Sequence, residues 1–280
     1  MATATLHDGS TIDIGERGSG PVVLLAVNST PVEGEQAEEM RKWGVDPDLG
    51  RPLVDGLADA FHVAAFDYEG HVLAHPKPDT LTPENVAADF LAVADAVGAG
   101  RFAYYGYSWL ALSGLQLALR TDRLSALVMG GFPPLNGPYA EMLSVTEATH
   151  RMTLEPETAV PGGTGEPGDW SSVEVGLSEE QARQFVTLYR ALRGFDDSQV
   201  ALSCPRLAFA GSKDEIQYDE RWGGAHVSLA GPLLRDRAEI EARGWDVDVL
   251  DGLDHGGAMQ AANVLPIMRP WLDRVLFPPA

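Results

Sequence analysis

Short, continuous apolar runs recur along the chain, and amphipathic stretches separate them. Runs of this length are typical of strands that are buried on both faces of a parallel sheet. They cover residues 22–27, 62–66, 102–105, 126–129, 206–210 and 246–250. Residues 11–14 instead alternate between apolar and polar positions, as a half-exposed strand does. We therefore expect a central sheet of about eight strands.

Helical patterns lie between the predicted strands. Thr82 and Pro83 mark a helix start, with a capping side chain followed by proline at the first helical position. Residues 108–120 are apolar almost all round, which predicts a buried helix. The last helix covers about residues 263–276, where two prolines would bend or divide it. Strands that alternate with helices predict an α/β fold, with a mostly parallel sheet flanked by helices.

The alternation breaks between the fourth and fifth apolar runs, where about seventy residues show no buried-strand pattern. This stretch contains a loop rich in glycine and proline at residues 161–168 and helical patterns at 138–151 and 178–193. We interpret residues 133–204 as a helical cap, or lid, inserted into a core formed by residues 1–132 and 205–280. An elongated surface crossover is the alternative.

The composition is that of an ordinary globular protein. Hydrophobic residues make up 45% of the 280 residues and charged residues 22%, which excludes a disordered chain. The 41 acidic residues outnumber the 20 basic ones and give a formal net charge of −21. Nucleic acids and anionic membranes bind clustered Lys or Arg, so we expect neither as a partner. We expect a small-molecule substrate, and a homodimer is compatible with the sequence.

Neither the cysteine content nor the N-terminus indicates export. Cys204 is the only cysteine, which fits a reducing compartment. The first residues contain no basic region followed by an apolar stretch, and no apolar run approaches the length of a membrane span. We therefore expect a cytoplasmic protein.

The sequence predicts neither a cofactor nor a metal. The glycines of residues 15–20 match neither nucleotide-binding loop spacing and indicate a hairpin turn. His71 and His75 follow a strand end and are spaced by four, but the neighbouring Gly70 and Pro76 argue that they do not lie on a helix, so a metal site at this pair with Asp67 is not expected.

Ser108 is the candidate nucleophile. An apolar strand precedes it and an apolar helix follows it, so a sharp turn at Gly106 would place its hydroxyl at the carboxyl edge of the sheet. The alternative is that Ser108 merely caps the helix. A second Gly-x-Ser, at Ser178, precedes a capping-box pattern and is expected only to start a helix.

A serine nucleophile needs a base and an acid that orients this base. His255 is the best-placed histidine, because it follows the last strand and has glycines beside it. Asp214 follows a buried strand and is the preferred acid, although it could be an ordinary turn residue. Glu215 is a fallback, and Asp251 and Asp254 are nearer to the histidine in sequence.

These segments resemble the α/β-hydrolase superfamily over nearly the whole chain. The resemblance rests on residues 22–27, Phe66-Asp-Tyr-Glu-Gly-His71, Thr82-Pro-Glu-Asn-Val-Ala-Ala-Asp89, Gly106-Tyr-Ser-Trp109, Ala210-Gly-Ser-Lys-Asp214 and Asp254-His255-Gly256. The chain order of nucleophile, acid and histidine also matches. The superfamily's other acid position falls in residues 130–136, which contain no carboxylate, and this favours Asp214.

The resemblance implies an oxyanion hole built from backbone N–H groups. One donor would be Trp109, and the other would come from the loop Asn28-Ser29-Thr30-Pro31, where relatives usually carry a His-Gly pair. Pro31 has no N–H, so Ser29 or Thr30 is expected, with help from the Asn28 amide or the Ser29 hydroxyl. Leu110 is a second departure, because this turn usually has glycine there.

The resemblance further implies a serine hydrolase that acts on a small, largely apolar ester, thioester or related carbonyl compound. Aromatic side chains would line its substrate pocket, namely Tyr107, Phe132, Tyr139, Trp170, Phe185 and Tyr189. The alternatives are a lyase or cofactor-free oxygenase, a binding protein with little turnover, and a proline-iminopeptidase-like enzyme. In the last of these, Glu155, Glu157 or Glu174 of the cap could hold an amine.

Overall fold

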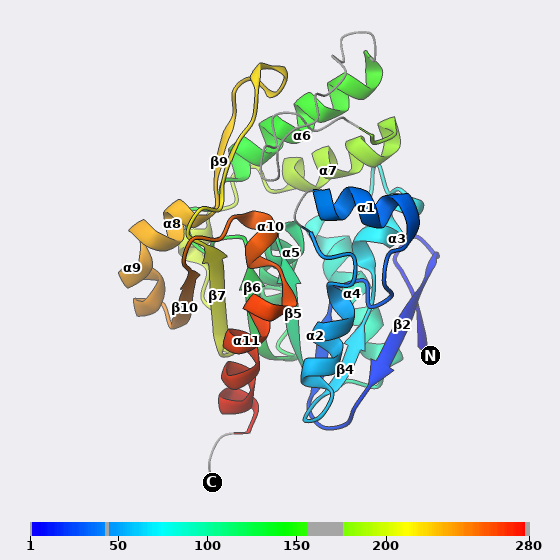
Figure 1. Ribbon diagram of the computed structural model, residues 1–280, viewed down its shortest axis with the longest axis vertical. Helices are drawn as coiled ribbons and strands as arrows, with labels where there is room; N and C mark the ends of the chain where they lie inside the picture. Colours follow the sequence, from blue (N-terminus) through cyan, green and yellow to red (C-terminus); the bar gives the residue numbers. More distant parts are fainter. Residues whose placement is uncertain (1, 43–44, 156–175, 278–280) are drawn as a thin grey trace.

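The predicted α/β architecture is confirmed by the computed structural model, which describes residues 2–42, 45–155 and 176–277. Eight strands form one sheet (Figure 1). Their spatial order is β1 (Ala2–Thr5), β2 (Thr11–Arg17), β4 (His62–Ala65), β3 (Val22–Leu25), β5 (Phe102–Tyr107), β6 (Leu124–Gly130), β7 (Arg206–Gly211) and β10 (Trp245–Leu250). β2 runs antiparallel to β1 and β4, and the other neighbouring pairs are parallel.

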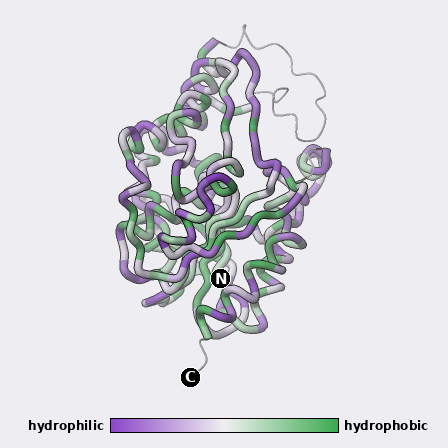
Figure 2. Tube along the Cα trace, turned by 90° about the vertical axis from the view of Figure 1, so that its left-hand side faces the viewer, coloured by the Kyte–Doolittle hydropathy of each residue, from purple (hydrophilic) through white to green (hydrophobic). Residues whose placement is uncertain are grey.

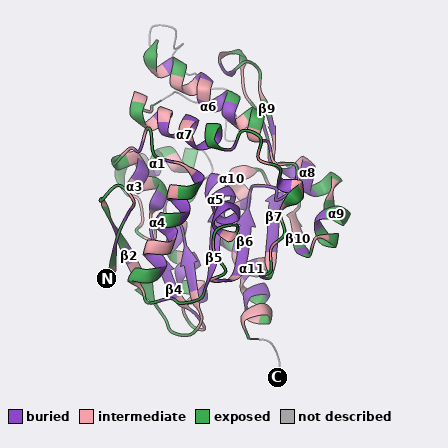
Figure 3. Ribbon diagram, turned by 180° about the vertical axis from the view of Figure 1, so that it is seen from behind, coloured by how far each residue is buried: buried purple, intermediate pink, exposed green. Residues whose placement is uncertain are grey.

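Five of the six apolar runs became the central strands, because both faces of the sheet are covered there. The sixth run, residues 246–250, became the edge strand β10, which is only partly buried. Every residue of β5 is buried, as are most residues of β6 and β7 (Figure 3). The alternating segment became β2, near one edge of the sheet, where apolar positions alternate with exposed ones. Hydrophobic stretches concentrate in the interior of the molecule (Figure 2).

Two hydrophobic cores lie on opposite faces of the sheet. One core contains α4 (Pro83–Ala96) and α5 (Trp109–Ala118), which pack against each other. The other contains α2 (Gly50–Leu57) and α11 (Ala261–Leu276). α11 includes both Pro266 and Pro270 and remains one helix, so the expected division at these prolines does not occur.

Several helix ends are fixed by the residues that the sequence pattern indicated. The Thr82 hydroxyl accepts a hydrogen bond from the Asn85 N–H at 3.3 Å and begins α4. Ser178 and Gln181 form a reciprocal capping box at the start of α7 (Glu179–Ala191). Ser178 therefore has the structural role expected for the second Gly-x-Ser.

A layer of helices lies beyond the carboxyl ends of the central strands. α6 (Tyr139–Leu154) and α7 pack against each other there (Figure 1). Residues 156–175 lie outside the described residues, so the boundaries of the cap remain a prediction. α1 (Gly34–Lys42) and α3 (Tyr68–Ala74) lie near α7 at the same end.

A β hairpin that the sequence analysis did not predict completes this layer. It consists of β8 (Glu215–Gln217) and β9 (His226–Ser228), joined through a short 3₁₀ helix at Glu220–Trp222. The Trp222 indole Nε1 donates a hydrogen bond to Thr149 Oγ1 of α6 at 2.9 Å. This contact attaches the hairpin to the helical layer, and we call α6, α7 and the hairpin together the roof.

The remaining helices are short and lie in the last fifth of the chain, on either side of β10. α8 (Ala230–Arg235) and α9 (Arg237–Ala242) precede β10, and α10 (His255–Ala258) precedes α11. Of the helices in the described ranges, none is both long and apolar enough to cross a membrane.

Candidate active site

Ser108 lies at a sharp turn between β5 and α5. Its backbone has φ 56° and ψ −128°, a left-handed conformation that L-residues other than glycine rarely adopt. Its N–H donates to the Gly130 carbonyl of β6 at 2.8 Å, which fixes the turn to the sheet. The Ser108 side chain makes no capping hydrogen bond to α5. The alternative role of a helix cap is therefore not observed.

Gly106 permits this turn. A Cβ atom at Gly106 would lie 2.4 Å from the carbonyl oxygen of Leu110 and 2.7 Å from the Tyr104 hydroxyl. The close approach at the strand–helix crossing thus involves the backbone of Leu110 and not its side chain. Leu110 is accommodated because its side chain is nearly buried at the border of a cavity, while its carbonyl accepts a hydrogen bond from Tyr104 at 2.9 Å.

His255 and Asp214 form a buried pair. His255 begins α10 after β10, and Asp214 follows β7 on the neighbouring strand. Nδ1 of His255 lies 2.9 Å from each carboxylate oxygen of Asp214, whose side chain is fully buried. Burial raises the pKa of Asp214, and the hydrogen bond and positive charge of His255 oppose this shift. Nδ1–H bonded to the carboxylate leaves Nε2 as the basic nitrogen.

The other acids considered for this role have different partners. The Asp254 carboxylate accepts a hydrogen bond from the Gly257 N–H at 2.8 Å and caps α10. Asp251 accepts a hydrogen bond from the Ser212 hydroxyl at 3.3 Å. Glu215 accepts hydrogen bonds from Ser228 and Gly231 and pairs with His226. Asp214 is therefore the acid that the fold brings to His255.

Tyr107 supports the histidine loop from the strand side. Its hydroxyl donates to the His255 carbonyl oxygen at 2.8 Å, and the two rings lie 5.0 Å apart. Burial, followed by the negative charge of Asp214, raises the pKa of Tyr107 well above its ordinary value, so the hydroxyl stays a donor. The loop that carries the imidazole is thus tied to the strand that leads to Ser108.

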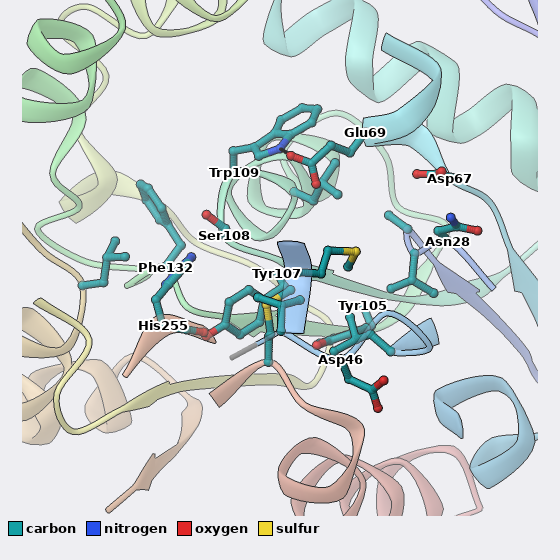
Figure 4. A pocket seen from close by; sticks show the side chains of 18 of the residues that line it. Asn28, Asp46, Asp67, Glu69, Tyr105, Tyr107, Ser108, Trp109, Phe132 and His255 are labelled. Carbon is teal, nitrogen blue, oxygen red and sulfur yellow. Dashed lines mark hydrogen bonds between the residues drawn. The ribbon is translucent and has the colours of Figure 1, made fainter. Parts of the chain in front are cut away.

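Ser108 and His255 border the same cavity, which has a volume of about 490 Å³ (Figure 4). The roof lines one side of the cavity, and the segments at the carboxyl ends of the strands line the side next to the sheet. Apolar side chains provide most of its lining. A cavity of this size and polarity suits a small, largely apolar molecule.

Three of the six aromatic residues expected in the pocket border the cavity, namely Tyr107, Phe132 and Tyr189. Tyr139 does not, because its ring packs behind Phe132 and against Phe195. Phe185 does not either, because its ring packs edge-on against Trp109 at 5.4 Å. Trp170 lies outside the described residues.

Other lining residues were not anticipated from the sequence. The hairpin and the loop after it contribute Ile216, Tyr218 and Leu229, and α6 contributes Met142. The strands of the hairpin are only three residues long, each with one buried position, so no periodic signal marks them.

The loop after β3 and the start of α5, which are expected to form the oxyanion hole, both contribute to the lining of the cavity. Asn28 and Trp109 border the cavity, whereas Ser29 and Thr30 do not. The Thr30 N–H donates to the Asn28 side-chain oxygen at 2.9 Å and is therefore occupied within the loop. Trp109 is the first residue of α5, where a backbone N–H has no partner within the helix.

No group of three or more His, Cys, Asp or Glu side chains within the described ranges could hold a metal ion. The expectation that His71 and His75 do not lie on a helix is wrong, because His71 belongs to α3 and His75 caps its C-terminal end. Their rings lie 5.0 Å apart, and His71 Nε2 is within hydrogen-bond distance of the Ser10 hydroxyl at 3.0 Å.

Comparisons with known proteins agree with this architecture. A thermophilic esterase from Thermogutta terrifontis is 18% identical, with 98% of this chain and 99% of the esterase covered and a TM-score of 0.59. An epoxide hydrolase, VrEH1 from Vigna radiata, is 17% identical, with 98% of each chain covered and a TM-score of 0.59. The enol-lactonase from Burkholderia xenovorans LB400 is 16% identical, with 96% of this chain and 99% of that enzyme covered and a TM-score of 0.58.

These similarities in structure show that the chain has the α/β-hydrolase fold. No protein-family model matches the sequence, and a search of curated proteins finds no match.

Proposed function

We propose that this protein is a serine hydrolase that cleaves a small, largely apolar carboxylic ester, thioester or related carbonyl compound. The observation that carries the proposal is that His255, paired with Asp214, borders the same cavity as a serine in a strained turn. Backbone strain of this kind concentrates at functional sites because the surrounding structure must enforce it.

In the proposed reaction, Ser108 Oγ attacks the substrate carbonyl carbon while His255 Nε2 takes the hydroxyl proton. The carbonyl oxygen becomes an oxyanion, which we assign to the backbone N–H groups of Trp109 and Asn28. As the tetrahedral intermediate collapses, the protonated imidazole returns the proton to the leaving oxygen or sulfur, and an acyl-enzyme remains. Water attacks the acyl-enzyme by the same route, releasing the acid and regenerating Ser108.

Asp214 supports both steps from behind the imidazole. Its two oxygens face Nδ1, so they fix the ring tautomer and stabilise the imidazolium that forms. A single oxyanion-hole donor typically contributes about 3 kcal/mol to the transition state. The Asn28 N–H is our choice over Ser29 and Thr30 because only Asn28 of this loop segment borders the cavity.

The Ser108→Ala variant tests the nucleophile. A fluorophosphonate probe is expected to label the wild type and to leave this variant unlabelled. With short-chain p-nitrophenyl esters, Ser108→Ala and His255→Ala should each lose at least about 10³-fold in kcat. Ser178→Ala is the matched control, because Ser178 only caps α7, and it should label like the wild type. Labelling that persists in Ser108→Ala contradicts the proposal.

Asp214→Asn tests the acid independently. The amide keeps the shape of the side chain but cannot stabilise the imidazolium, so kcat should fall by roughly 10³–10⁴-fold. Glu215→Gln changes the adjacent carboxylate, which has other partners, and should retain kcat within about threefold. Steady-state kinetics on one ester compares the two variants. Equal losses in both would remove Asp214 from the mechanism.

A further inference from the structure

The cavity has two chemically different sides. Phe132 lies on one side, where the hairpin and α6 add further apolar side chains (Figure 4). Carboxylates lie on the other side, from Asp46, Asp67 and Glu69. The lining residues in the described part of the chain include no Lys and no Arg. Ser108 and His255 therefore stand beside a region of negative charge.

Two of the three carboxylates have structural partners. Asp67 caps α3, where one oxygen accepts a hydrogen bond from the Gly70 N–H at 2.9 Å. Asp46 accepts a hydrogen bond from the Asp48 N–H at 2.9 Å and thereby shapes its own loop. Neither residue needs a ligand to explain its position.

Glu69 differs from these two residues because it contacts Trp109, the residue next to the proposed nucleophile. Its Oε1 accepts a hydrogen bond from the Trp109 indole Nε1 at 3.3 Å, and no hydrogen bond to its Oε2 is found in the described ranges. Trp109 directly follows the nucleophile, and its ring is held between Tyr68 and Phe185. The carboxylate is thus fixed one tryptophan side chain away from the proposed oxyanion donor.

The surroundings of Glu69 leave its charge poorly compensated. The Glu69 side chain is exposed and borders the cavity, which is partly open to solvent. Partial desolvation by the surrounding protein raises the pKa of Glu69, and the negative charge of Asp67 adds to this shift, while the Trp109 hydrogen bond and the charge of His255 oppose it. A carboxylate in such a place is stabilised by a cation that arrives with a ligand.

We propose that Glu69 is a specificity-determining residue that binds an ammonium group of the substrate. This inference rests on the proposed hydrolase activity and narrows its substrate class to amino-acid esters or closely related amines. The short span from Glu69 to Trp109 places the ammonium group within a few bonds of the reacting carbonyl. The apolar body of the substrate then extends toward Phe132 and the roof.

Matched esters test this inference through a ratio of rates. Leucine p-nitrophenyl ester and 4-methylpentanoate p-nitrophenyl ester differ only in the amino group. The wild type should prefer the amino ester by about tenfold or more in kcat/KM. In Glu69→Gln the preference should fall below about threefold, because the neutral amide keeps the shape but not the charge. Glu84→Gln, at an exposed site on α4, should keep the wild-type preference.

Equal rates for the two esters in the wild type, or a preference that survives in Glu69→Gln, would overturn the inference. Such a result leaves the proposed function intact as long as Ser108 is labelled and the neutral ester is hydrolysed. Loss of labelling together with loss of all ester turnover would instead defeat the proposed function.

A binding measurement decides the inference even without turnover. Leucinamide and 4-methylpentanamide are titrated calorimetrically into Ser108→Ala. Leucinamide should bind at least about tenfold more tightly, and adding Glu69→Gln should abolish the difference. Equal affinities for the two amides in Ser108→Ala would refute an ammonium site at Glu69.

Discussion

At the scale of single residues, the turn around Ser108 depends on the absence of a side chain at Gly106. Gly-x-Ser alone occurs twice in this sequence, so the motif could not distinguish the candidate nucleophile from the other serine. The flanking apolar strand and helix favoured Ser108, because they place it at the carboxyl edge of the sheet. The expected crowding at Leu110 is resolved in the structure, since the backbone of Leu110 and not its side chain approaches β5.

Gly106→Ala should therefore disrupt the turn. The new methyl group would meet the Leu110 carbonyl oxygen at 2.4 Å, and this backbone oxygen cannot move without displacing α5. We expect a loss of roughly 2–3 kcal/mol in the free energy of unfolding, together with reduced activity. Chemical denaturation measures the loss. Gly100→Ala is the control, because a methyl group there would meet nothing within 4 Å, and it should change stability by less than about 0.5 kcal/mol.

The local sequence could not predict that the carboxylates of Asp46, Asp67 and Glu69 border the cavity. Glu69 lies in the first turn of α3, which follows β4. Its proposed role in binding an ammonium group depends on a contact with Trp109, forty residues away in the chain. The direction of such a side chain is decided by tertiary packing and leaves no periodic trace. By contrast, His255 and Asp214 could be predicted, because each lies in a loop that follows a parallel strand, and such strands end at one edge of the sheet.

At the scale of elements, long and strongly apolar segments were predictable, and short polar ones were not. The central strands and α4, α5, α6 and α7 correspond to the sequence pattern. β1 and the hairpin were missed because they are three or four residues long and partly exposed. The hairpin is held largely by its contacts with other elements, among them the bond from Trp222 to Thr149.

Trp222→Phe should loosen the roof. The change removes the indole N–H that binds Thr149, at a cost of about 1 kcal/mol. We expect faster amide exchange in residues 215–229 and a KM that rises roughly three- to tenfold, since the hairpin lines the cavity. Trp271→Phe is the control, because it removes a comparable hydrogen bond, from the Trp271 indole N–H to Asp246 at 2.6 Å. Trp271 lies on α11, which does not line the cavity and packs in the core on one face of the sheet. An unchanged KM in Trp222→Phe, or the same rise in Trp271→Phe, would contradict this role.

At the scale of the whole molecule, an ion pair between a buried lysine and a surface aspartate connects the edge of the sheet to the roof. Lys77 is buried, and its ammonium group pairs with Asp8 in the turn between β1 and β2. The Lys77 N–H also donates to Gln184 of α7 at 3.0 Å. In a protein with a net charge of −21, this lysine supplies a positive charge in the interior. The pair thus holds distant parts of the chain in one arrangement.

The pH dependence of stability should report this pair. Burial raises the pKa of Asp8, but the hydrogen bonds from Lys77 and Ser10 outweigh it, so the pKa lies well below its usual value. A lowered pKa stabilises the fold above the unfolded pKa of about 4, and the contribution is lost as the pH falls further. Asp8→Asn should cost roughly 2 kcal/mol at pH 7 and progressively less below about pH 4.

Denaturant unfolding of the wild type and Asp8→Asn across this pH range measures the difference. Asp79→Asn is the control, because Asp79 pairs with Arg183 at the surface and should cost less than about 1 kcal/mol. A difference between the wild type and Asp8→Asn that stays constant from pH 7 to pH 3 would show that the pair does not titrate as expected.

The hairpin of the roof begins at the residue directly after Asp214. The Asp214 carbonyl also accepts hydrogen bonds from the N–H groups of Leu229 and Ala230, at 3.1 Å and 2.9 Å, where the hairpin rejoins the core. Both ends of the hairpin are therefore anchored at the backbone of Asp214, whose side chain pairs with His255. Any displacement of the hairpin would therefore shift the backbone of Asp214, so we expect the arrangement of the hairpin and the geometry of the His255–Asp214 pair to change together.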